Sequence, residues 1–159
     1  MTEFHKNFSY VELTHTDHRE FDNTPTEKER CQLVRGGPYV EINAVANLPR
    51  LSQFLGKLKF DVFGGRAVYI NSGFRSHDVN TSVGSGDYSD HRRGCAADIR
   101  VEGMTPREVT LAIIASGFDF EQVILEFDRW THVAIPTHEG DVPRKSKLII
   151  DKAGTRPFA

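Results

Sequence analysis

The stretch "SDHRRGCAADIR", residues 89–100, places a histidine, His91, and an aspartate, Asp98, seven positions apart with small residues between them. Its second half runs into Val101 as a short apolar segment typical of a buried strand, so Asp98 is expected on a strand and His91 on the loop before it. Gly94 and the neighbouring alanines allow the backbone to turn tightly. The two side chains can therefore converge, as two ligands of one metal ion would.

A third ligand is available in "WTHVAIP", residues 130–136, where His132 interrupts an otherwise apolar strand pattern. Two imidazoles and one carboxylate suit Zn²⁺, and three protein ligands leave one tetrahedral position for water, as in catalytic sites. The chain contains no H-E-x-x-H sequence, which excludes the zinc proteases that carry their ligands on one helix. The pattern thus predicts a zinc site built from a loop and two strands.

The surrounding sequence predicts one α+β domain, with an antiparallel sheet packed against helices. Capping patterns of the form Ser/Thr-x-x-Glu at residues 9–12, 24–27 and 105–108, and an amphipathic run at 48–65, indicate helices. Strand patterns occupy residues 67–74, 96–101, 120–127, 130–136 and 147–151. We therefore expect a helical half over about residues 1–65, and the sheet with the metal site over about 66–152.

Composition limits the possible partners. The chain has 159 residues and a net charge of −2, which fits a single domain and gives no general basic field for nucleic acid. It has no apolar run long enough for a membrane span and no apolar segment near its start, so we expect synthesis in the cytoplasm without a signal peptide. A monomer is expected, with Cys31 and Cys95 as reduced thiols.

Three sequence blocks together resemble one enzyme family. "SDHRRGCAAD" fits Ser-x-His-x-x-Gly-x-Ala-x-Asp, "SGFRSHDVN" (72–80) precedes it, and "EFDRWTHV" (126–133) follows it. In order and spacing, these blocks are similar to the zinc D-alanyl-D-alanine carboxypeptidases. That family includes the D,D-dipeptidases of vancomycin resistance and the L-alanyl-D-glutamate endopeptidases of phage endolysins. "NFSYVEL" (7–13) and "NTP" (23–25) look like the small phage-type members.

The resemblance implies a fold like that of the D,D-peptidases and the hedgehog signalling domain, and it implies roles for individual residues. His91, Asp98 and His132 fall on the zinc ligands of the family. Arg75 falls on an arginine that engages the substrate carboxylate or carbonyl oxygen, which suits a guanidinium because it can bind such groups with two N–H donors. Ser89 falls on a serine that hydrogen-bonds near the site and is expected to help to bind substrate.

The general base departs from the family pattern. Several branches carry a glutamate three residues before the last histidine, but this chain has Arg129 there, which cannot act as a base. Glu126 and Asp128 lie six and four residues before His132. If the segment is a hairpin, Glu126 ends one strand and faces the histidine on the next, whereas Asp128 sits in the turn. We predict Glu126 as the general base, with Asp128 as the alternative.

The predicted function is that of a zinc peptidase that hydrolyses a peptide bond in the stem or cross-link peptides of bacterial peptidoglycan. The phage-type resemblance and the expected lack of a signal peptide favour an endolysin released through a holin pore. One alternative is a non-catalytic zinc-containing binding or virion-structural domain, since the hedgehog domain keeps its zinc site without evident need for peptidase activity. The other is a D,D-dipeptidase for free D-Ala-D-Ala, for which a narrow, closed pocket is expected.

Overall fold

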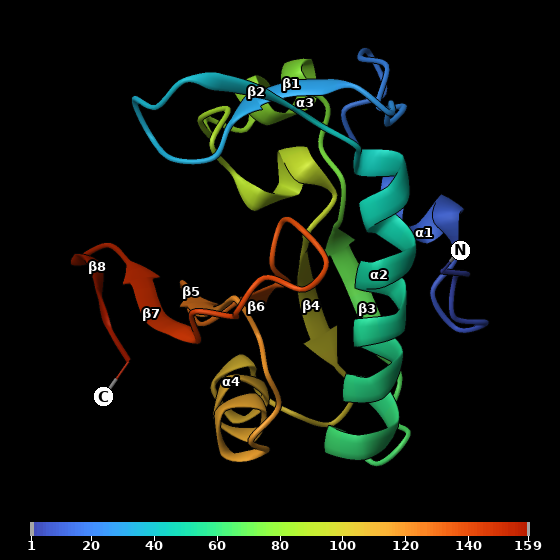
Figure 1. Cartoon of the computed structure of the whole chain (residues 1–159). Coiled ribbons are helices and arrows are strands. Elements are labelled where there is room, and N and C mark those ends of the chain that lie inside the picture. Colours follow the sequence, from blue (N-terminus) through green and yellow to red (C-terminus); the bar gives the residue numbers. More distant parts are fainter. Residues whose placement is uncertain (1, 159) are drawn as a thin grey trace.

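A six-stranded sheet organises the computed structural model, which describes residues 2–158 (Figure 1). The strand order is β3-β4-β6-β5-β7-β8. The strands are β3 (Val68–Ser72), β4 (Ala96–Val101), β5 (Gln122–Glu126), β6 (Trp130–Ala134), β7 (Ser146–Asp151) and β8 (Gly154–Pro157). The chain is a single α+β domain, as its sequence predicts.

The six-stranded sheet is antiparallel, as predicted, except for one strand pair. β7 runs parallel to β5, with Ser146 beside Gln122 and Ile150 beside Glu126. The reason is the route of the chain, because β6 ends where β5 begins and residues 135–145 then enter β7 from that same end. As a consequence, the C-terminal ends of β5 and β7 meet at one edge of the sheet.

Two helices cover one face of the sheet and form the core with it. α2 (Ala44–Lys57) continues into a π-helical turn, η1 (Leu58–Val62), and α4 (Pro106–Ala115) follows β4. Buried leucines of α2 belong to one cluster with Ala97, Ile99 and Val133 of the sheet. Since side chains alternate along a strand, Asp98 and His132 must face the opposite side. The core packing therefore fixes which strand residues reach the site.

The capping patterns have different outcomes. Ser9 caps α1 (Tyr10–Thr14), and Thr105 forms a complete capping box with Glu108 at the start of α4, as predicted. The helix predicted from residues 24–27 is wrong, because that segment leads into a strand, β1 (Glu29–Gln32), paired with β2 (Tyr39–Ile42). α2 begins four residues before the predicted run, where the side chain of Asn43 caps it.

The β1–β2 hairpin is held in place by an arginine that could not be foreseen as its partner. The Arg92 guanidinium lies 2.7 Å from the Glu29 carboxylate, and both side chains are buried. Glu29 also accepts hydrogen bonds from the Thr26 N–H and hydroxyl, at 2.8 and 3.0 Å. Thr26 therefore bonds to a strand residue, while Thr24, the predicted helix cap, donates its hydroxyl to Asp22 at 2.6 Å instead. The first 65 residues are consequently not only helical.

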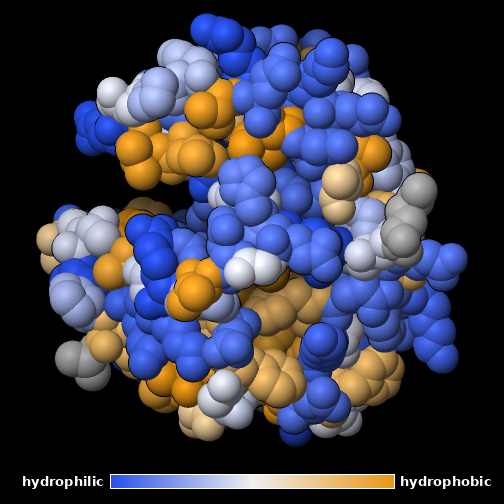
Figure 2. All heavy atoms as spheres, in the orientation of Figure 1, coloured by the Kyte–Doolittle hydropathy of each residue, from blue (hydrophilic) through white to orange (hydrophobic). Residues whose placement is uncertain are grey.

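The remaining short helices complete a lobe above the sheet. α3 (His77–Ser82) and the 3-10 turn η2 (Asp90–Arg93) lie with the β1–β2 hairpin on one side of a hollow (Figure 1). The strands β5, β7 and β8 lie on the other side, and Figure 2 shows the open hollow between the two parts. Among residues 2–158, every helix falls short of the length and apolar character that a bilayer span requires.

Candidate metal centre

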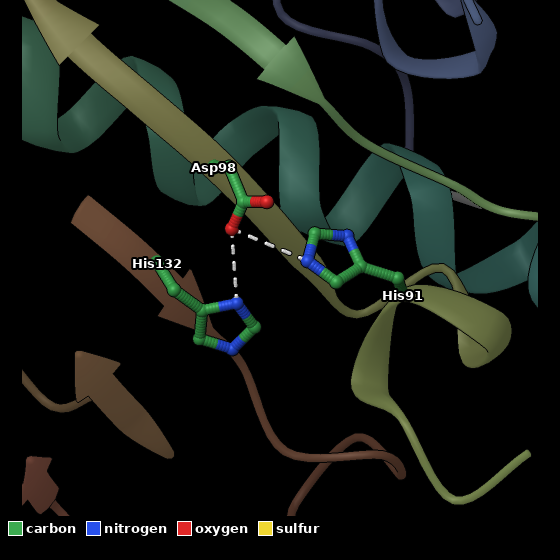
Figure 3. Close-up of side chains that lie close together, drawn as sticks. All are labelled: His91, Asp98 and His132. Atoms are coloured by element: carbon green, nitrogen blue, oxygen red, sulfur yellow. Dashed lines mark hydrogen bonds and ion pairs between the residues drawn. The ribbon is translucent and has the colours of Figure 1, made fainter. Parts of the chain in front are cut away.

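Three predicted ligands meet at the floor of the hollow (Figure 3). Asp98 on β4 and His132 on β6 are direct cross-strand partners, and His91 reaches them from η2. The Asp98 Oδ1 atom lies 3.3 Å from His91 Nε2 and 3.1 Å from His132 Nδ1. The three side chains are buried, and they offer one ligand atom each within 4.8 Å of one another. Two imidazoles and a carboxylate so placed suit a divalent zinc ion.

Small residues allow the loop to bring His91 to the strands. Gly94 ends η2 in the left-handed region, at φ +72°, where residues with a side chain are disfavoured. A Cβ atom at this position would also lie 2.9 Å from the carbonyl oxygen of Ala44, at the start of α2. The glycine in the opening sequence block therefore permits both the turn and its packing against the helix.

The hydrogen bonds of His91 indicate that the site is built for a cation. Its Nδ1 atom lies 2.7 Å from the Gly73 carbonyl oxygen, which can only accept, so this nitrogen carries the proton. In the neutral ring, Nε2 then directs a lone pair at the Asp98 oxygen. Burial lowers the pKa of His91, which disfavours a second proton there. A metal ion between the two atoms would remove this conflict, as in other histidine sites whose outer nitrogen is hydrogen-bonded.

The charges of the cluster also indicate a site for a cation. Burial alone would raise the pKa of Asp98, but the neighbouring imidazoles of His91 and His132 hold it well below its usual range. Burial opposes protonation of His132, yet the hydrogen bond and the charge of Asp98 raise the pKa of this histidine. Asp98 thus stays an anion that needs positive charge beside it. A bound metal ion would supply that charge in place of a proton.

Of the two predicted carboxylates, only Glu126 borders this floor. It is the last residue of β5, and its Oε1 atom lies 3.9 Å from His132 Nδ1. Burial raises the pKa of Glu126, and the nearby charge of Asp98 raises it further. The Asp128 side chain is 71% exposed and lies beside Arg107, outside the residues that line the hollow. The geometry therefore favours Glu126 as the proton acceptor.

Arg75 and Ser89 lie together on the wall of the hollow. The Arg75 Nη2 atom donates to Ser89 Oγ at 3.4 Å, and the backbone N–H of Arg75 donates to the His91 carbonyl. Its Nε atom is buried without a hydrogen-bond partner among the described residues. Burial lowers the pKa of Arg75 because it penalises the charged form. A half-buried guanidinium with a free Nε donor is well suited to an anionic group of a ligand.

Asn23 fixes the segment that carries Arg75, a role that the sequence did not reveal. Its Nδ2 atom donates to the carbonyls of Thr14 and Phe74, at 2.8 and 3.0 Å, and its Oδ1 atom accepts from the Ser76 N–H at 2.7 Å. The side chain thus holds the residues on both sides of Arg75. Only the motif "NTP" hinted at a special position here.

We call this hollow the cleft. Its walls include residues that no sequence motif marks as functional. The cleft has a volume of about 950 Å³. The tip of the β1–β2 hairpin, Leu33 to Arg35, lines one side, together with the loop that carries His15 and His18. Figure 2 shows hydrophobic surface along the margin on the hairpin side. His77 is exposed and does not line the cleft, and its Nδ1 atom pairs with Asp87 at 2.9 Å.

The comparisons with known proteins agree with this site. A family model described as Peptidase M15 matches residues 40–134, which is more than half of the chain. The matched segment includes the three candidate metal ligands and Glu126. A comparison with curated proteins gave no match.

Proposed function

The chain belongs to the M15 family of zinc peptidases, and we propose that it hydrolyses a peptide bond in the stem or cross-link peptides of bacterial peptidoglycan. The observation that carries this proposal is the Glu126 carboxylate beside the buried group of His91, Asp98 and His132. A proton acceptor next to a metal site is what hydrolysis of a peptide bond requires.

Each residue of the site has a distinct role in this proposal. His91, Asp98 and His132 hold zinc, which when bound acidifies a water molecule and polarises the substrate carbonyl. Glu126 accepts a proton from the attacking water and delivers it to the leaving amine. Arg75 binds the substrate carboxylate or the oxygen on which negative charge develops, and Ser89 orients the Arg75 guanidinium.

The shape of the cleft supports a peptide substrate larger than a free dipeptide. The cleft opens to solvent on the side seen in Figure 2, and several separate elements border it. A D,D-dipeptidase for free D-Ala-D-Ala would be expected to enclose its substrate. Peptidoglycan peptides, which are attached to a polymer, need an open path. Within this proposal, the protein acts on the wall as a phage endolysin after release through a holin pore.

A non-catalytic binding or virion-structural domain would need the metal ligands but no proton acceptor. The placement of Glu126 on the cleft side of β5, 3.9 Å from a metal-binding nitrogen, is therefore the feature that favours an enzyme. The raised pKa of Glu126 also suits a group that must take up and release a proton.

The test is to incubate the zinc-loaded protein with peptidoglycan sacculi and to identify the released fragments by mass spectrometry. New amino termini at one defined bond are expected, and they should disappear with a chelator or with Glu126→Gln. Intact sacculi in the presence of stoichiometric zinc would overturn the proposed substrate. Release of D-alanine from the free dipeptide alone would favour the dipeptidase instead.

A further inference from the structure

The turn between β5 and β6 has one residue, Phe127, that its backbone disfavours. Phe127 and Asp128 both have positive φ, at 56° and 51°, and the Arg129 N–H donates to the Glu126 carbonyl across the turn at 3.0 Å. Turns of this kind favour asparagine, aspartate and glycine. A phenylalanine in the left-handed region carries conformational strain, since its Cβ crowds the backbone. Some benefit of the aromatic ring must offset this strain.

Core packing does not provide that benefit. Phe127 is 46% exposed and is not part of the buried hydrophobic cluster. Its ring lies 6.3 Å from that of Trp130, and its backbone N–H donates to the Ile150 carbonyl at 2.8 Å, which anchors the turn to β7. The turn therefore holds an aromatic ring at the surface in a fixed place. Strain of this kind is concentrated at functional sites.

A second hollow lies beside this ring. Because β5 and β7 are parallel, the β5–β6 turn and the β7–β8 turn meet at the same edge of the sheet. We call the space between them the turn hollow; it is lined by Phe127, Asp128, Arg129, Trp130, Asp151, Lys152 and Ala153. Phe127 and Trp130 also line the cleft. A ligand that leaves the cleft past Glu126 therefore meets this hollow next.

The lining has the chemistry of a carbohydrate site. Aromatic rings offer a negative face to the C–H groups of a sugar ring, and polar side chains around them can bond to its hydroxyl and amide groups. Arg129 and Lys152 are exposed in this lining and form no ion pair within residues 2–158, so a ligand can reach their donors. We propose that the turn hollow binds a pyranose ring of the peptidoglycan glycan strand while the attached peptide lies in the cleft, an inference that rests on the proposed function.

The single tryptophan of the chain makes this inference measurable. Trp130 lines both hollows, so its fluorescence should change on titration with chitotriose, a soluble trimer of β-1,4-linked N-acetylglucosamine. Phe127→Gly removes the ring and suits the positive φ of the turn. We expect it to weaken binding at least 10-fold while leaving the melting temperature unchanged or higher. Phe60→Ala, a matched change at another exposed phenylalanine, should bind as the wild type does.

The outcomes separate this inference from the proposed function. Saturable binding that depends on Phe127 supports the glycan site, even if the protein releases no fragments from sacculi. Cleavage of sacculi without any saturable fluorescence change overturns the glycan site alone. Equal affinities of the wild type and Phe127→Gly also overturn it, because the ring would then contribute nothing.

Discussion

The floor and the rim of the cleft differ in how firmly the fold holds them. The floor consists of His91, Asp98, His132 and Glu126, on or beside the central strands, and its three metal ligands are at most 6% exposed. The rim consists of the hairpin tip at residues 33–35 and the turn residue Phe127. Val34 is 62% exposed there. From this comparison we expect the strands to position the metal site and the exposed turns to influence which substrate binds.

The largest effect is expected at the floor. Glu126→Gln removes the proton acceptor but keeps the size of the side chain, so turnover should fall by roughly 10²- to 10⁴-fold. Zinc content should stay at the wild-type level, because Glu126 is not one of the three ligands. Asp128→Asn is the matched control and should retain activity, since Asp128 lies outside the cleft. Initial rates on a purified wall peptide that carries no glycan measure both, and equal losses in the two variants would contradict the assignment.

The second largest effect is expected at Gly73, which supports His91 from outside the cleft. A Cβ atom at Gly73 would clash with the Leu13 carbonyl oxygen, and the Gly73 carbonyl accepts a hydrogen bond from His91. Gly73→Ala should lower the free energy of unfolding by about 1–3 kcal/mol. It should also weaken zinc binding by roughly 10- to 100-fold, as losses of outer partners of metal ligands do.

Gly64→Ala is the control for this prediction. Gly64 has a positive φ of 61° and open space around it, so alanine there strains the backbone by about 1–2 kcal/mol without touching the site. Its zinc affinity, measured by competition with a chromophoric chelator, should equal that of the wild type. If both variants lose zinc affinity equally, general destabilisation rather than support of His91 explains the result.

Substitution of Asn23 tests whether the hydrogen bonds that hold the segment around Arg75 matter for activity. Asn23→Ala leaves the Phe74 carbonyl and the Ser76 N–H without their partner, which should lower kcat/KM by up to roughly 10²-fold through misplacement of Arg75. Zinc content should not change. Asn7→Ala, at an exposed asparagine, should alter neither quantity. The measurement is steady-state kinetics on a purified wall peptide. An Asn23→Ala variant with the kcat/KM of the wild type would exclude this positioning role.

The smallest effects are expected at the rim. Val34→Ala should change the free energy of unfolding by no more than about 0.5 kcal/mol, as is usual at exposed positions. It should still raise the KM for wall substrate by roughly 3- to 10-fold, since a ligand in the cleft would cover its methyl groups. Val142→Ala, at an 87% exposed valine outside the cleft, is the control. If Val34→Ala lowered the free energy of unfolding but left KM unchanged, the expected difference between floor and rim would be contradicted.

The same contrast explains what the sequence could predict. Alternation along β4 and β6 places Asp98 and His132 on the face opposite the core, and small residues around Gly94 mark the loop that brings His91 to them. These signals are local, so the convergence of His91, Asp98 and His132, the strands that carry the last two and the hairpin with Glu126 could be inferred from the sequence.

The rim depends on contacts between distant parts of the chain. Glu29 is drawn into a strand by its ion pair with Arg92, 63 positions away, which overrides the helix-capping pattern at residues 24–27. The parallel pairing of β7 likewise depends on the path of residues 135–145 and not on the strand pattern itself. Neither contact leaves a periodic signal, and both determine what borders the cleft.

The most direct test of the account is zinc binding by the floor. Metal-free wild-type protein dialysed against zinc should retain one ion per chain and unfold at a higher temperature than before. Asp98→Asn should retain none, whereas Cys95→Ala, beside the same loop but buried away from the ligand group, should retain one. Loss of zinc in Asp98→Asn alone is the predicted result. Wild-type protein that retains no stoichiometric zinc, or Asp98→Asn that retains one ion per chain, would show that this group of residues does not hold the metal.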